Sequence, residues 1–364
     1  MKIVSYQFPI PADSLLRIAD MLRDRDVLTP GFDIRNADVY DPATYLIQKE
    51  DHDTDTRLLA DRNLLTRWIN LTKAGLVTDE VKAAAAVLVF CQCCGILVEP
   101  NISLYEVAAE SGNGVANSEE IMFRAVDNAD PRVLAEVALG NFNNTPRSFI
   151  TLEDMPSSKD IDFSMPLRMW RRNYVLALKA AAIALDGGRT ETLVERLFDW
   201  MYSQYVFLAP STVLALSYFS PNGPKKGLFK KIRSEDRERA IAGIKNAAWD
   251  LTLIHQWLHM VRGQQTNNTI NLLGSLDRKL HTVARNILVF TDSDEVVEAV
   301  RRETFDSLWG IRPNTRLYSK ILKYYEDSEN PTRLANRVDD QVTIDDLILK
   351  GEQEIRKWHP SNRA

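Results

Sequence analysis

The feature that most constrains the fold is a short apolar run that ends in an acidic residue followed closely by an amide. Leu58-Leu59-Ala60 leads directly into Asp61 and then Asn63, and a helical pattern begins at once. A buried strand with this ending predicts an open α/β sheet, in which ligands bind at the carboxyl ends of the strands. A carboxylate at that place either helps to hold a cation or simply caps the helix that follows.

Composition narrows the class of protein. The chain has 364 residues, of which 45% are hydrophobic and 26% charged, as in soluble globular proteins of two domains or of one domain with a large insertion. The net charge of -5 gives no overall attraction to nucleic acid, so any such binding needs a local basic patch or a metal site. Cys91, Cys93 and Cys94 follow an alanine-rich apolar run, which indicates buried thiols and a reducing cytoplasm.

The order of the predicted elements favours a parallel sheet. Strands are predicted at 58–61, 96–98, 271–277 and 287–290, each followed by a helical pattern. Strands that alternate with helices are typical of a parallel sheet with helical crossovers. Between the second and third strands, residues from about 165 to 261 read as a long series of helices.

Four acidic residues stand out by their positions in this pattern. Asp61 ends the first predicted strand, and Glu106 lies one turn into the helix after the second strand. Asp277 ends the third strand, two residues after Ser275. Asp250 lies inside a long helix among small and apolar residues, where an aspartate is unfavourable unless it has a partner.

These segments resemble the motifs of the PIN-domain nucleases. The apolar-Asp-x-Asn motif of that family is matched by Leu59-Ala60-Asp61-Arg62-Asn63, and its glutamate on an early helix by Leu104-Tyr105-Glu106-Val107. A third acid after alanine is matched by Ala247-Ala248-Trp249-Asp250, and the closing Ser/Thr-x-Asp-basic motif by Ser275-Leu276-Asp277-Arg278. The order of the four motifs and their flanking hydrophobicity agree with the family.

The resemblance implies an α/β fold: a three-layer PIN-like parallel sheet with helices on both faces, plus a large, mostly α-helical insertion. The expected parts are an N-terminal extension at 1–50, a core at 51–109 and 235–305, the insertion at 110–234 and a C-terminal helical extension at 306–364. Asp250 departs most from the family, because it lies deep in its helix and far along the chain from Glu106. Its possible substitutes as third acid are Asp127, Asp154 and Glu238.

Carboxylates that converge on one point repel each other unless a cation neutralises them. Oxygen ligands suit Mg²⁺ or Mn²⁺, and such an ion can activate water and bind a scissile phosphate. The ligands implied are Asp61, Glu106, Asp250 and Asp277. Asn63 and Ser275 would hydrogen-bond the water, the phosphate or the carboxylates. Substrate phosphates would be bound by Arg168, Arg171, Arg172, Lys225, Lys226, Lys230 and Lys231, unless these are ordinary solvated charges.

We therefore expect a cytoplasmic, metal-dependent endoribonuclease that acts on RNA and has no membrane association. Two other functions stay open. One is a structure-specific DNA nuclease on a related fold, and the other is a non-catalytic helical interaction module in which the acids are caps and surface charges. The sequence also leaves open a homo-oligomer and an inhibitory protein partner.

Overall fold

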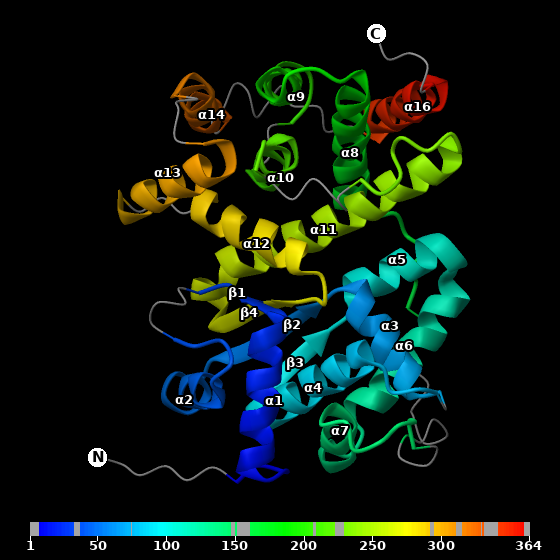
Figure 1. Cartoon of the computed structure of the whole chain (residues 1–364), viewed down its shortest axis with the longest axis vertical. Coiled ribbons are helices and arrows are strands. Elements are labelled where there is room, and N and C mark those ends of the chain that lie inside the picture. Colours follow the sequence, from blue (N-terminus) through cyan, green and yellow to red (C-terminus); the bar gives the residue numbers. More distant parts are fainter. Residues whose placement is uncertain are drawn as a thin grey trace. The chain divides into compact units, whose positions relative to one another are not determined.

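The computed structural model describes residues 7–32, 37–73, 75–146, 150, 161–206, 209–222, 229–291, 295–310, 315–328, 330 and 341–359. The chain divides into two compact units. Unit 1 comprises Met1–Met165 and Gln256–His281, and unit 2 comprises Pro166–His255 and Thr282–Ala364. The described chain is mostly helical, with one small sheet that lies within unit 1 (Figure 1).

Unit 1 contains both helices and strands. They are α1 (Ala12–Arg25), β1 (Leu28–Pro30), α2 (Pro42–His52), β2 (Asp55–Ala60), α3 (Arg62–Leu71), α4 (Asp79–Cys94), β3 (Ile96–Glu99), α5 (Asn101–Ser111), α6 (Asn113–Asp127), α7 (Pro131–Ala138) and β4 (Thr269–Gly274). Two long helices, α11 (Arg237–Asn267) and α12 (Arg278–Thr291), contribute residues to both units.

The sheet of unit 1 is mixed and has the strand order β1-β4-β2-β3. β2 lies inside it and pairs in parallel with β3 on one side and with β4 on the other. β1 pairs with β4 in the antiparallel direction. The carboxyl ends of β2, β3 and β4 therefore meet at one edge of the sheet, where an open α/β sheet carries its ligands. The predicted parallel pairing holds for these three strands, whereas the antiparallel β1 was not predicted.

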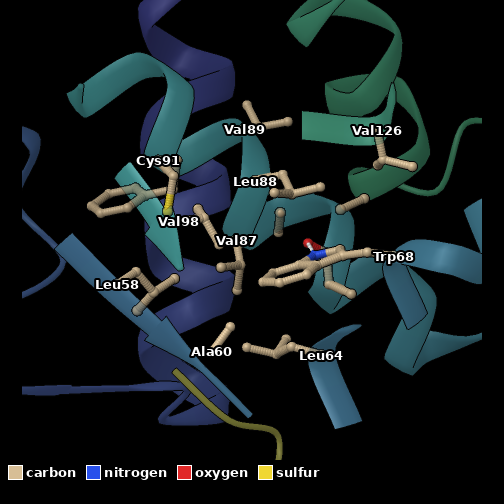
Figure 2. Packing of buried hydrophobic residues seen from close by; sticks show 14 of the residues in the cluster. Leu58, Ala60, Leu64, Trp68, Val87, Leu88, Val89, Cys91, Val98 and Val126 are labelled. Carbon is tan, nitrogen blue, oxygen red and sulfur yellow. Dashed lines mark hydrogen bonds between the residues drawn. The ribbon is translucent and has the colours of Figure 1, made fainter. Parts of the chain in front are cut away.

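One face of the sheet is buried by α3 and α4. Leu58 and Ala60 of β2 point into a cluster that includes Leu64 and Trp68 of α3 and Val87 of α4 (Figure 2). The indole Nε1–H of Trp68 donates to the backbone oxygen of Ala84 at 2.8 Å, so the two helices are joined through a buried polar contact. Because these side chains are buried against one another, they fix the end of β2, and with it the start of α3.

The opposite face of the sheet contacts the C-terminal part of α11 at β4. Asn271, next in β4 to the buried Leu272, donates from Nδ2 to the backbone oxygen of Met260 at 3.0 Å. The indole of Trp257 donates to the backbone oxygen of Asn271 at 3.2 Å. Successive side chains of a strand point to opposite faces, so helices contact both sides of this sheet within unit 1.

Unit 2 is helical in the part that the structure describes. Besides its shares of α11 and α12, it contains α8 (Arg168–Asp186), α9 (Thr190–Gln204), α10 (Ala209–Phe219), α13 (Glu295–Trp309), α14 (Thr315–Ser328) and α16 (Gln341–Lys357). α8 packs against α16, α9 and α10. A small core cluster in this unit contains Val175, Tyr205, Val206 and Ile344.

The observed division differs from the predicted one in several places. The expected core segment 235–305 is divided, because only 256–281 belongs to unit 1 and the rest belongs to unit 2. The expected N-terminal extension, 1–50, supplies α1 and β1 to unit 1, and Leu15, Ile18 and Leu22 of α1 lie in its core. The expected insertion, 110–234, divides between the units, because α6 and α7 belong to unit 1 and α8 to α10 belong to unit 2. Length and motif spacing do not reveal such a division, since it depends on packing between distant segments.

One predicted strand is wrong. The apolar run at 287–290 lies inside α12 and is helical. A run of four apolar residues is equally compatible with a buried strand and with a buried stretch of helix, and periodicity alone cannot separate them. The predicted strands at 58–61 and 96–98 are confirmed, and the one predicted at 271–277 is observed as Thr269–Gly274.

Candidate functional site

The polar residues predicted at the ends of β2 and β4 come together. The hydroxyl of Ser275 donates to Oδ2 of Asp61 at 2.6 Å, and the side-chain amide of Asn63 donates to the same oxygen. The amide of Asn63 also donates to Ser275 Oγ at 3.0 Å. These three side chains form one hydrogen-bonded triangle, in which Ser275 is 214 positions along the chain from Asp61.

The orientation of the Asn63 amide is fixed by its surroundings. Its Oδ1 accepts the backbone N–H of Leu276 at 3.0 Å. A backbone N–H can only donate, so the oxygen must face Leu276 and the NH₂ group must face Asp61 and Ser275. Each polar atom of the Asn63 side chain therefore has a partner, and the asparagine ties the loop after β4 to the start of α3.

Asp61 also caps α3, as the simpler interpretation of the sequence expects. Its Oδ1 accepts the backbone N–H of Arg62 at 2.7 Å. The side chain is 8% exposed. Its carboxylate thus binds the helix N-terminus through one oxygen and the Asn63–Ser275 pair through the other. Capping and cation binding are compatible, because each carboxylate oxygen carries two lone pairs.

Glu106 is brought toward the same edge of the sheet by α5. Ser103 in the first turn of α5 donates from Oγ to the backbone oxygen of Ala60 at 2.8 Å, directly before Asp61. Glu106 follows Ser103 by three residues, so the two side chains share one face of the helix. Glu106 is 8% exposed and Ser103 is 2% exposed. Ser103 has no sequence signal beyond its place near the start of a helix.

Asp277 is connected to the triangle through its backbone. Its N–H donates to Ser275 Oγ at 2.9 Å. Its side chain is exposed and accepts the backbone N–H of Lys279 at 2.9 Å, so it caps α12. The structure thus places Asp61 and Asp277 on either side of one serine hydroxyl, and Asp277 is the more solvent-accessible of the two.

The predicted third acid lies in the other unit. Asp250 belongs to the part of α11 in unit 2, and Asn246 donates to its Oδ2 at 3.3 Å. Of its proposed substitutes, Asp127 ends α6 in unit 1, and burial raises the pKa of its carboxyl above the usual value. Glu238 pairs with Arg356 in unit 2. Asp154 lies outside the described residues.

The basic residues beside the acids have partners of their own. Arg62 forms an ion pair with Glu119 of α6, with Nη1 to Oε2 at 2.7 Å. Arg278 donates from Nη2 to the backbone oxygen of Asp24 at 2.7 Å and from Nε to that of Arg25 at 3.2 Å. Arg278 therefore joins the start of α12 to the C-terminus of α1.

The predicted phosphate-binding residues lie in unit 2. Arg168, Arg171 and Arg172 lie in the first two turns of α8, and Arg171 pairs with Asp345 of α16. Lys225 and Lys226 lie outside the described residues.

The other two predicted lysines belong to a turn that is held in place. Lys230 and Lys231 are exposed, between the buried Phe229 and Ile232. Lys231 has a positive φ of 59°, which is unusual for a residue other than glycine. The backbone oxygen of Lys230 lies so close to Gly243 of α11 that a Cβ there would be 2.0 Å from it.

The acidic residues at this edge of the sheet suit a hard cation by their chemistry, since they offer carboxylate oxygens. Within the described ranges, no three or more His, Cys, Asp or Glu side chains are arranged as metal ligands. Mg²⁺ is commonly held by only one or two carboxylates together with water and substrate phosphate. Asp61 and Glu106, both largely buried at the sheet edge, are compatible with that mode of binding.

Among the helices of the described residues, none is both long and apolar enough to cross a membrane. Comparisons with protein-family models, with curated proteins and with solved structures find no match to this chain.

Proposed function

We propose that this chain is a metal-dependent nuclease, most directly an endoribonuclease, with a PIN-like core at the β3-β2-β4 edge. The observation that carries the proposal is the 2.6 Å hydrogen bond from Ser275 Oγ to Asp61 Oδ2. It joins the Asp-x-Asn motif to the Ser-x-Asp motif at the carboxyl ends of two adjacent parallel strands.

The strand order supports the same proposal. β2 carries Asp61 at its end and lies between β3, which leads to Glu106 in α5, and β4, which leads to Asp277. Three acidic residues from three chain segments are thereby directed to one edge of the sheet. Asp250 stays a separate prediction, since it belongs to unit 2.

Asp61 and Glu106 would hold Mg²⁺ or Mn²⁺, with water and substrate phosphate completing the coordination. When bound, the ion would lower the pKa of an attacking water and neutralise negative charge on the scissile phosphate. The protein's part is to keep the carboxylates in one orientation. Asn63 and Ser275 do this for Asp61, because both donate to the same oxygen of its side chain. Preorganised ligands avoid rearrangement during the reaction.

Cleavage of RNA by the purified protein tests the proposal. We expect the wild type to cleave a single-stranded RNA in the presence of Mn²⁺. In Asp61→Asn the cleavage rate should fall at least about 100-fold, as it does when a catalytic group is misplaced. Asp130→Asn is the matched control, because Asp130 caps α7 through Arg132 N but lies outside the site. A panel with structured RNA and flapped DNA identifies the substrate class.

The alternative of a non-catalytic interaction module has one observation in its favour. Asp61 and Asp277 both cap helices, α3 and α12. Under that alternative the wild type cleaves none of the three substrates with Mg²⁺ or Mn²⁺, and Asp61→Asn changes only stability. Equal cleavage by wild type and Asp61→Asn would likewise exclude the proposed site.

A further inference from the structure

A buried histidine lies directly behind the site. His281, in the first turn of α12, is fully buried. Its Nε2 lies 3.0 Å from the backbone oxygen of Ser275. Its Nδ1 lies 2.7 Å from Oγ1 of Thr29, which is also fully buried, in β1. The imidazole thus connects the edge strand β1 to the serine that binds Asp61.

The hydrogen-bond partners indicate the tautomer. A backbone oxygen can only accept, so the proton lies on Nε2 of His281 and is donated to Ser275. In the neutral ring Nδ1 is an acceptor, and the hydroxyl of Thr29 donates to it.

Ser275 is held on every polar atom. Its N–H donates to the backbone oxygen of Val27 at 3.1 Å, and its C=O accepts from His281. With both backbone groups fixed, the direction of its Cα–Cβ bond is fixed as well. The hydroxyl then donates to Asp61 and accepts from Asn63 and from the N–H of Asp277. The orientation of the Asp61 carboxylate therefore depends on the backbone of Ser275.

We propose that His281, anchored by Thr29, is a positioning residue for the catalytic carboxylate Asp61 and acts through Ser275. This inference rests on the proposed nuclease function. It assigns a role to β1, whose short antiparallel pairing with β4 brings Thr29 against the ring. In metal sites, residues that orient a ligand typically contribute about 10- to 100-fold to activity or metal affinity.

Two substitutions at this position separate positioning from packing. In His281→Gln the side-chain amide reaches the place of Nε2 and can still donate to Ser275, whereas in His281→Asn it reaches the place of Nδ1 and keeps only the Thr29 contact. We expect kcat for RNA cleavage to fall about 10- to 100-fold in His281→Asn. His281→Gln should stay nearer to the wild type, and KM should change little in both. Equal losses in the two variants would overturn the proposal.

A second pair guards against loss of folding. Thr29→Val replaces the hydroxyl with a methyl group at nearly constant volume, whereas Thr29→Ser keeps a hydroxyl and loses the methyl group. The proposal requires lower kcat in Thr29→Val and recovery in Thr29→Ser, and equal kcat in both variants would contradict it.

A readout without substrate keeps this inference separate from the proposed function. Amide hydrogen exchange of Asp277, whose N–H donates to Ser275 Oγ, should be faster in His281→Asn than in His281→Gln. If the wild type cleaves no RNA but the exchange rates differ in this way, the nuclease proposal fails while the link from His281 to Ser275 stands. If the exchange rates are the same in both variants, the link itself is wrong.

Discussion

Asp61 combines a structural and a proposed chemical role in one side chain. One oxygen caps α3 through the N–H of Arg62, and the other accepts from Ser275 and Asn63. A buried carboxylate with this many donors contributes to stability whether or not a cation binds. The two roles can be separated only by variants that change them to different extents.

The first residue-scale prediction concerns stability. In Asp61→Asn a side-chain NH₂ group replaces an oxygen that accepts hydrogen bonds, so a donor faces donors and hydrogen bonds are lost. We expect the free energy of unfolding to fall by about 1–3 kcal/mol. Asp130→Asn should change it by less than about 0.5 kcal/mol, because asparagine and aspartate are comparable N-caps. Urea titration of both variants without metal measures the difference. Equal stability of the two would show that the hydrogen-bonded triangle contributes nothing to folding.

The second residue-scale prediction tests the cation directly. Asn63→Asp places a second carboxylate against Asp61 and removes two donors, so the metal-free protein should melt at a lower temperature. Addition of Mn²⁺ should then raise Tm more in Asn63→Asp than in the wild type, because the ion relieves the new repulsion.

Asn141→Asp is the matched control for that experiment. Asn141 also donates to a carboxylate, that of Glu136, at 2.6 Å, and both residues are exposed. Mn²⁺ should not raise the Tm of this variant more than that of the wild type. The same metal response in both variants would speak against a specific ion at Asp61.

The elements explain why the site could be predicted only in part. β2 and β3 carry clear signals, an apolar run followed by a polar residue, and Asp61 and Ser275 directly follow the adjacent strands β2 and β4. β1 escaped prediction because it has three residues and ends in Pro30. The contact between Thr29 and His281 spans 252 positions. No local pattern encodes such a pairing, which arises only when β1 packs beside β4.

α4 gives the element-scale prediction. Cys91, Cys93 and Cys94 are all buried in its last turns. Burial raises the pKa of the Cys93 thiol to about 11 and raises that of Cys94 further. A raised pKa means less reactive thiolate at pH 8, so the folded protein should resist alkylation by iodoacetamide. All three thiols should react once urea unfolds unit 1, and rapid labelling of the folded protein would show that α4 opens locally.

At the scale of the whole molecule, charge decides how a nucleic acid can bind. The chain carries a net charge of -5, so attraction to phosphates must come from local groups. Lys230 and Lys231 are exposed in a turn that Phe229, Ile232 and the close contact at Gly243 hold in place. Keeping a lysine at a positive φ, where glycine is easier to accommodate, favours a role for its charge.

The whole-molecule prediction follows from this turn. Lys231→Gly relieves the backbone and should leave the free energy of unfolding within about 1 kcal/mol of the wild type. RNA affinity should decrease, and the slope of log K against log salt should become less negative by about 0.7 for a lost single-strand phosphate contact. The control is Lys323→Ala, which removes one exposed charge from α14. Unchanged salt slopes in Lys231→Gly would exclude the turn from RNA binding.

The measurement that tests the central claim most directly is a titration of the substrate-free protein with Mn²⁺. Binding is measured as the loss of the free-ion signal in electron paramagnetic resonance. The account predicts that the wild type and Asp130→Asn bind Mn²⁺ with equal affinity. Asp61→Asn and Glu106→Gln should bind it at least about 10-fold more weakly, which is the smallest effect typical of losing a residue that orients a metal ligand. Identical titrations of wild type and Asp61→Asn, with both proteins folded, would contradict it.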